Sequence, residues 1–133
     1  MFTLSRQFTF CYAHRLQKHT GKCAQLHGHN GTVKIELHNG QLNTQGMVVD
    51  FADVKKLIGE WIETTLDHRT ILHEMDPLAG VLRGLGEPVF TLPAPPTAEN
   101  LAKLIYEHAQ HLGLPVCSVA FWETAKCAVK YAP

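Results

Sequence analysis

A His-Gly-His triplet within the stretch Gly21–Asn30 constrains this chain more than any other feature of its sequence. In an extended segment, side chains two positions apart point to the same face, so His27 and His29 can reach one ion. Gly28 between them carries no Cβ that could obstruct the approach. A third imidazole, His14, ends a strand-like run upstream. Three neutral histidines with an open fourth position are typical of a catalytic zinc ion, so the sequence predicts a Zn²⁺ site here.

Cys23 precedes this triplet and has more than one interpretation. It is a fourth metal ligand, a thiol beside the metal, or an ordinary loop cysteine. A thiol close to a divalent cation and to histidines ionises more readily, so it can act as a base or a nucleophile. Local sequence alone leaves these alternatives open.

Composition limits the class of protein. The chain has 133 residues, of which 45% are hydrophobic, which suits one domain with a buried core. Twelve basic residues balance twelve acidic ones, so we expect no nucleic-acid partner and no anionic-membrane partner. The N-terminus has no signal-peptide layout, and no stretch is long enough to cross a bilayer. The four cysteines form no metal-finger spacing, and the chain is expected to be cytoplasmic with reduced thiols.

Hydrophobic periodicity predicts the elements. Period-two alternation indicates strands over residues 2–12, 32–38, 116–122 and 127–131, with a short strand at 47–49. Helical spacing predicts one helix from Asp50 to about Thr65 and another that begins after Thr97 and ends at Gly113. Residues 13–29 read as irregular, and residues 73–96, rich in glycine and proline, as a long ordered loop.

The order of these elements indicates the fold class. Two strands, two helices and two strands (ββααββ) imply an α+β domain with a four-stranded antiparallel sheet and both helices on one face. No repeat or composition shift divides the chain, so we expect one domain over residues 1–133.

Several other residues could carry chemistry. Asp67 and His68 are adjacent, and a carboxylate beside an imidazole orients the ring. Glu123 shares a strand face with Val119 and Phe121, so it is either a buried carboxylate that needs a partner or a strand-end residue in solvent. A flat heterocycle with adjacent N–H donors would be one such partner.

Charged and capping residues near these positions have simpler explanations as well. Thr97 and Glu99 are accounted for as a helix cap and as a partner of the helix dipole. Four cationic residues flank the histidines and could meet phosphate, or could be ordinary solvated charges: Arg15, Lys18, Lys22 and Arg69.

Taken together, six short motifs resemble the 6-pyruvoyl-tetrahydropterin synthase / 6-carboxy-tetrahydropterin synthase family. They occur in the family's order and cover nearly the whole chain. They are F-x-x-x-H-R-L (10–16), C-x-x-x-H-G-H-N (23–30), GMVVDF (46–51), LDH (66–68), PTAEN (96–100) and WET (122–124).

The resemblance implies a tunnelling fold, in which subunits join their sheets into a barrel and the barrels stack into a homohexamer with active sites at subunit interfaces. It implies one Zn²⁺ per subunit on His14, His27 and His29. Cys23 matches the catalytic thiol, and two further groups match by motif: the thiol-tuning pair Asp67 and His68, and the pterin-binding residues Glu123, Thr97 and Glu99.

The spacing Cys-x-x-x-His-Gly-His resembles the carboxy-forming branch of the family, which serves queuosine biosynthesis. The implied reaction is a lyase reaction that converts 7,8-dihydroneopterin triphosphate to 6-carboxy-5,6,7,8-tetrahydropterin, acetaldehyde and triphosphate. The pyruvoyl-forming reaction is the alternative enzyme, and a non-catalytic zinc-stabilised module is the alternative of another class. Two features depart from the family pattern. CYAHRL (11–16) replaces the usual run of small residues before His14, and the segment 73–95 is longer than in compact members.

Overall fold

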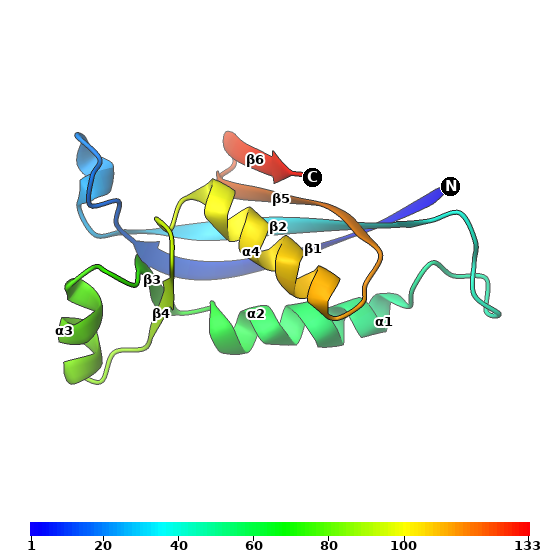
Figure 1. Cartoon of the computed structure of the whole chain (residues 1–133), viewed down its shortest axis with the longest axis horizontal. Coiled ribbons are helices and arrows are strands. Elements are labelled where there is room, and N and C mark those ends of the chain that lie inside the picture. The colour runs from blue at the N-terminus through cyan, green and yellow to red at the C-terminus, as the bar shows by residue number, and fades with distance from the viewer.

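The computed structural model describes residues 1–133 as one curled, mixed sheet with helices on one face (Figure 1). The sheet has six strands in the order β4-β3-β1-β2-β5-β6. The strands are β1 (Phe2–His14), β2 (His27–Asn39), β3 (Arg69–His73), β4 (Val89–Leu92), β5 (Val116–Thr124) and β6 (Cys127–Tyr131).

Two helical stretches lie along the sheet, and a third helix lies at one end of the molecule (Figure 1). The first stretch is α1 (Phe51–Val54), the π-helical segment η2 (Lys55–Gly59) and α2 (Glu60–Thr65). Asp50 begins it by accepting a hydrogen bond from the N–H of Ala52. The second is α4 (Ala98–His111), which Thr97 caps through the N–H of Asn100. The end helix is α3 (Leu78–Gly84).

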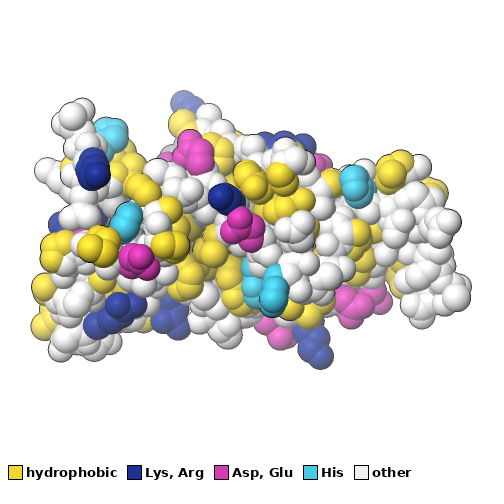
Figure 2. All heavy atoms as spheres, in the orientation of Figure 1, with side chains coloured by type: hydrophobic (Ala, Val, Ile, Leu, Met, Phe, Trp, Pro, Cys, Tyr) yellow, Lys and Arg dark blue, Asp and Glu magenta, His cyan; other side chains and the backbone are white.

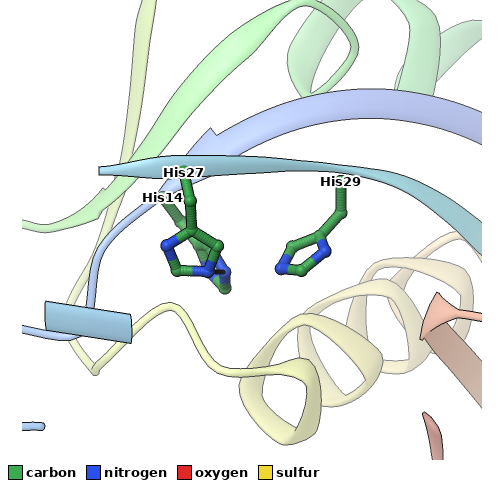
Figure 3. Close-up of side chains that lie close together, drawn as sticks. All are labelled: His14, His27 and His29. Atoms are coloured by element: carbon green, nitrogen blue, oxygen red, sulfur yellow. Dashed lines mark hydrogen bonds between the residues drawn. The ribbon is translucent and has the colours of Figure 1, made fainter. Parts of the chain in front are cut away.

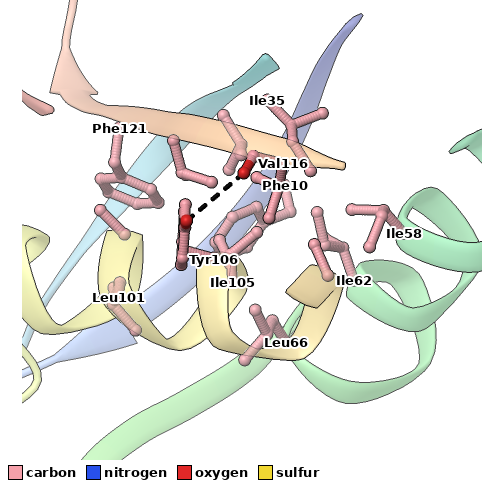
Figure 4. Packing of buried hydrophobic residues seen from close by; sticks show 14 of the residues in the cluster. Phe10, Ile35, Ile58, Ile62, Leu66, Leu101, Ile105, Tyr106, Val116 and Phe121 are labelled. Atoms are coloured by element: carbon pink, nitrogen blue, oxygen red, sulfur yellow. Dashed lines mark hydrogen bonds between the residues drawn. The ribbon is translucent and has the colours of Figure 1, made fainter. Parts of the chain in front are cut away.

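The core lies between the helices and one face of the sheet, where alternate strand residues meet apolar helix positions (Figure 4). Val33 and Ile35 of β2 and Phe121 of β5 are fully buried there. The opposite face carries the intervening residues of β2, among them Lys34 and Glu36. Because successive residues of a strand point to opposite faces of the sheet, the position of a residue in β1 or β2 decides which face its side chain occupies.

The α+β class and the placement of two helices on one face agree with the sequence, but the strand count does not. The predicted four-stranded antiparallel sheet is wrong, because β3 and β4 add two strands that run parallel to β1. The segment 73–96, predicted as a loop, contains α3 and β4. These elements are only seven and four residues long and are bounded by glycine and proline, so periodicity does not reveal them.

Smaller differences concern local runs. Residues 47–49 form no strand, and the triplet at 27–29, predicted to be irregular, is the start of β2. Cys127, at the start of β6, is exposed. None of the helices combines the length and apolar character that crossing a bilayer requires.

Candidate metal centre and active site

The pairing of β1 with β2 brings the three histidines together. In the antiparallel register, His14 stands opposite His27, and Tyr12 stands opposite His29. Residues 27 and 29 share a face, and cross-strand neighbours on one face have adjacent side chains. Figure 3 shows the three rings projecting to the same side of the strands, and their ligand nitrogens lie within 4.8 Å of one another.

In His14 and His27, a hydrogen bond to a backbone carbonyl determines which ring nitrogen is left unprotonated and able to bind a metal ion. His14 Nδ1 donates to the carbonyl of Pro96 at 2.7 Å, and His27 Nδ1 donates to the carbonyl of Gln25 at 2.7 Å. A carbonyl only accepts, so in each neutral ring the proton is on Nδ1 and Nε2 carries a lone pair. The two Nε2 atoms face each other at 3.1 Å, which cannot be a hydrogen bond between neutral rings. A cation between them would turn this repulsion into attraction.

His29 and Glu123 complete the local charge pattern. His29 Nε2 is buried and has no hydrogen-bond partner, which is costly for a polar atom unless something binds it. The Glu123 carboxylate lies 3.9 Å from the Nε2 atoms of His14 and His29 and adds negative charge beside the cluster. Three convergent imidazole nitrogens and a nearby carboxylate fit a divalent metal ion, and three imidazoles are a ligand set that Zn²⁺ accepts.

Burial keeps these groups in the forms that bind a metal. Burial lowers the pKa of His14, and this effect exceeds the opposing influence of the Pro96 carbonyl and of Glu123. The neutral, ligating form of His14 is therefore favoured at neutral pH. Burial, with the nearby charge of Glu123, raises the pKa of Tyr12, so this phenol stays protonated beside the rings of His14 and His29.

Gly28 has a different role from the one the sequence suggested. Its missing side chain would point away from the metal-facing side, because strand residues alternate. A Cβ there would lie 3.1 Å from the carbonyl oxygen of Tyr12. The glycine therefore allows β1 and β2 to approach closely where the ligands pair.

Cys23 lies outside the three-histidine cluster in this chain. It sits in a short 3₁₀ turn, η1 (Lys22–Ala24), and is half-buried. Its carbonyl accepts the N–H of Leu16 at 2.8 Å, which ties the turn to the segment that follows β1. Its thiol does not join the group of ligand atoms around His14, so the structure offers no fourth-ligand geometry for it.

Asp67 and His68 form a pair, but not beside these histidines. His68 Nδ1 donates to Asp67 Oδ2 at 2.8 Å, and the pair gathers with the thiol of Cys11 within 4.8 Å. Burial alone would raise the pKa of Asp67, but hydrogen bonds from His68 and from the Cys11 N–H outweigh it and lower that pKa. Cys11 alternates with Tyr12, so its side chain faces away from the metal side of the sheet.

His68 itself has a strained backbone. Its φ is 58°, and it is the only residue other than glycine with a positive φ. Such conformations cost energy and often occur at functional sites. The imidazole is exposed, with 78% of its side-chain surface accessible. The pair is thus presented outward, on the side away from His14.

A pocket of about 230 Å³ adjoins the histidines and contains the residues expected near a ring ligand. Glu123 lines it together with Thr97 and Glu99, and the far wall comes from β6 at Cys127. Sequence reasoning missed Cys127 and the two carbonyl groups of Pro96 and Gln25. Every residue has a carbonyl, so no residue type marks those that hold the rings.

The sheet, its helix-covered face and the three convergent imidazoles define a tunnelling-fold protein with a candidate metal centre. The chain belongs to the 6-pyruvoyl tetrahydropterin synthase family, whose profile matches residues 3–133. This match confirms the family and fold class expected from the motifs.

Relatives of known name and solved structures agree with this membership. The 6-carboxy-5,6,7,8-tetrahydropterin synthase of Haemophilus influenzae is 34% identical over 140 residues, covering 98% of this chain and 99% of the relative. That of Aquifex aeolicus is 34% identical over 128 residues, covering 86% and 78%. The structure of Caenorhabditis elegans 6-pyruvoyl tetrahydropterin synthase has a TM-score of 0.74 at 27% identity, covering 99% and 95%. An uncharacterized protein from Wolinella succinogenes has a TM-score of 0.83 at 27% identity, covering 98% and 97%.

Proposed function

We propose that this chain is a Zn²⁺-dependent lyase that converts 7,8-dihydroneopterin triphosphate and one water molecule to 6-carboxy-5,6,7,8-tetrahydropterin, acetaldehyde and triphosphate. The observation that carries the proposal is the convergence of three imidazole nitrogens beside a carboxylate-lined pocket. The names of the Haemophilus and Aquifex relatives support the carboxy-forming reaction.

The three histidines would hold the metal. When bound, Zn²⁺ supplies a Lewis acid that acidifies hydroxyl groups of the substrate side chain. Glu123 would accept hydrogen bonds from the amino group and ring N–H of the pterin, with Thr97 and Glu99 in the same pocket. This anchoring would fix the side chain of the substrate toward the histidines.

Cys23 and the pair of Asp67 and His68 would transfer the protons. The Cys23 thiolate would remove a side-chain proton, and His68, oriented by Asp67, would shuttle it. Because that pair faces away from His14 in its own chain, we propose that it serves the site of a neighbouring subunit. A homohexamer of single-domain chains, with active sites at the subunit interfaces, would bring these groups together.

Product analysis tests this reaction. The zinc-loaded protein is incubated with 7,8-dihydroneopterin triphosphate, and the products are identified by mass spectrometry. We expect 6-carboxy-5,6,7,8-tetrahydropterin and acetaldehyde. A 6-pyruvoyl product would assign the chain to the pyruvoyl-forming reaction, which the C. elegans protein is named for.

A zinc-stabilised module without activity is the alternative of another class. It would yield no product, bind no pterin and unfold when zinc is removed. Circular dichroism before and after chelation, recorded on the same sample, separates that outcome from a lyase that has merely lost its metal.

A further inference from the structure

A second pocket, of about 620 Å³, lies on the other side of the candidate active site. It shares Leu16 and Thr97 with the pocket that contains Glu123. Pro96, whose carbonyl holds His14, also lines it. The two pockets therefore meet beside the metal centre, and one elongated ligand could occupy both.

Cationic and imidazole side chains gather in this second pocket, and no carboxylate lines it. Four cationic or imidazole side chains contribute: Arg15, Lys18, His19 and His73. Figure 2 shows histidine and basic side chains at this end of the molecule, which is formed by the segment after β1 and by α3. The lining thus supplies hydrogen-bond donors and positive charge, without the opposing charge that would repel an anion.

A backbone N–H two residues further along the chain sets the tautomer of both His19 and His73. His19 Nδ1 accepts the N–H of Gly21 at 2.8 Å, and His73 Nδ1 accepts the N–H of Met75 at 2.9 Å. An N–H only donates, so Nδ1 is unprotonated in each ring and the proton is on Nε2. Each imidazole therefore presents an Nε2–H that its own chain does not use.

Arg15 is fixed in place by a buried partner. Its Nε and Nη2 donate to the carboxylate of Asp76, whose side chain is only 1% exposed. Asp76 also accepts the N–H of Leu78 at the start of α3. Asp76 offsets much of the charge of Arg15, but it leaves Nη1 free to donate and holds the guanidinium rigidly. Lys18, exposed and without an ion-pair partner, supplies the full positive charge.

We propose that this pocket, lined by Arg15, Lys18, His19 and His73, binds the triphosphate of the substrate while the pterin ring occupies the Glu123 pocket. The inference rests on the proposed function, which supplies a ligand with an anionic tail at one end and a heterocycle at the other. Nitrogen donors from a lysine, an arginine and two imidazoles match the oxygens of a polyphosphate. The segment between the two ends would pass the three metal-binding histidines.

The direct test uses inorganic tripolyphosphate as the probe on the zinc-loaded full-length protein. Calorimetry is run at constant ionic strength with Lys18→Ala and with the double variant His19→Ala/His73→Ala. Each lost charged or imidazole donor should weaken binding by about tenfold. Lys56→Ala removes an exposed lysine outside the pocket and should bind like the wild type. Unchanged affinity in both pocket variants, or no binding by the wild type, would overturn the proposal.

A second measurement separates this inference from the proposed reaction. The KM for 7,8-dihydroneopterin triphosphate should rise in Lys18→Ala, whereas affinity for 7,8-dihydroneopterin, which lacks phosphates, should not change. Equal losses for both ligands would overturn the triphosphate assignment and leave the reaction standing. Pocket-dependent tripolyphosphate binding in a protein without turnover would support the pocket and refute the reaction. Zinc content and circular dichroism confirm that each variant is folded.

Discussion

Asp67 accepts the backbone N–H of Cys11 at 3.0 Å, which fixes the Asp67–His68 pair to β1 on the side away from His14. The same strand therefore holds a candidate metal ligand, His14, on one face and the proposed acid–base pair beside the other. Within one chain, the alternation of β1 therefore keeps the two groups on different sides of the sheet. The proposal that two chains share one active site can therefore be tested.

Mixed oligomers should reveal this division. Cys23→Ala and His68→Ala should each be inactive alone, because each lacks one group of every site. After the two are unfolded and refolded together, about one quarter of the sites should combine an intact Cys23 with an intact His68 from a neighbour. Activity is measured before and after mixing. A mixture that stays inactive while forming oligomers would place both groups in one chain.

Removing one ligand should release the metal. His27→Ala should lower the bound zinc, measured by atomic absorption, well below one per chain, whereas His38→Ala, exposed on the same strand, should keep it. At free Zn²⁺ of about 100 times Kd, binding should stabilise the wild type by about 2.7 kcal/mol. That corresponds to a rise in Tm of roughly 10 °C, which His27→Ala should not show. Full zinc content in His27→Ala would refute the ligand set.

Glu123 should matter for the heterocycle more than for the metal. Glu123→Ala removes charge-assisted hydrogen bonds to the ring and should weaken pterin binding by about 10- to 100-fold, with zinc content retained. Glu63→Ala, an exposed control on α2, should change neither. Fluorescence titration with a pterin measures the affinity. Loss of zinc instead of pterin would assign the carboxylate to the metal.

Gly28→Ala tests the close approach of β1 and β2. The added methyl would press against the carbonyl of Tyr12, which is backbone and cannot swing away. We expect a loss of about 1–2 kcal/mol in stability and a weaker metal site. Gly40→Ala has nothing within 4 Å of the added methyl and serves as the control. Equal stability of the two variants in urea would show that the contact relaxes at no cost.

Glu36 gives the expected dependence of stability on pH. Hydrogen bonds from Ser118, and next from Lys130 and Lys34, lower the pKa of Glu36 from 4.5 to about 2. A pKa lowered in the folded state means that the carboxylate stabilises the fold above pH 4.5, and that this contribution is lost as the pH falls toward 2. The side chain is 19% exposed, and we expect roughly 2 kcal/mol.

Urea unfolding over this range measures the effect. Glu36→Gln should be less stable than the wild type at pH 7 and should show a shallower decline in acid. Glu74→Gln, an exposed residue, should follow the wild-type curve. Parallel curves for Glu36→Gln and the wild type would show that the cluster contributes no pH-dependent stability.

Prediction from sequence succeeded where one strand or helix carries the signal. The alternation of Val33 and Ile35 marks β2, and the caps Asp50 and Thr97 mark both long helical stretches. The clustering of the three histidines, the candidate metal site, could be predicted because antiparallel pairing of two adjacent strands is enough to set His14 against His27. Each of these features depends on residues close together in the chain or on one simple pairing.

What escaped prediction depends on tertiary position. The pairing of β3 with β1 brings Asp67 and His68 to Cys11, and nothing in LDH reveals which face or which cysteine they meet. Arg15 and Asp76 are 61 positions apart, so their contact follows only from how α3 folds back. Short parallel strands with few residues likewise carry too little periodicity to be recognised.

The continuous ladder that pairs Phe2 through His14 with the residues from Asn39 back to His27 has a consequence for how the candidate site would take up a metal ion. The ladder and the two carbonyl contacts set the spacing of the imidazoles before any ion arrives. The candidate site should thus be preorganised for a metal ion, unlike a zinc finger, whose metal drives its folding. Loading can follow synthesis and assembly, and an emptied enzyme should be rechargeable without passing through an unfolded state.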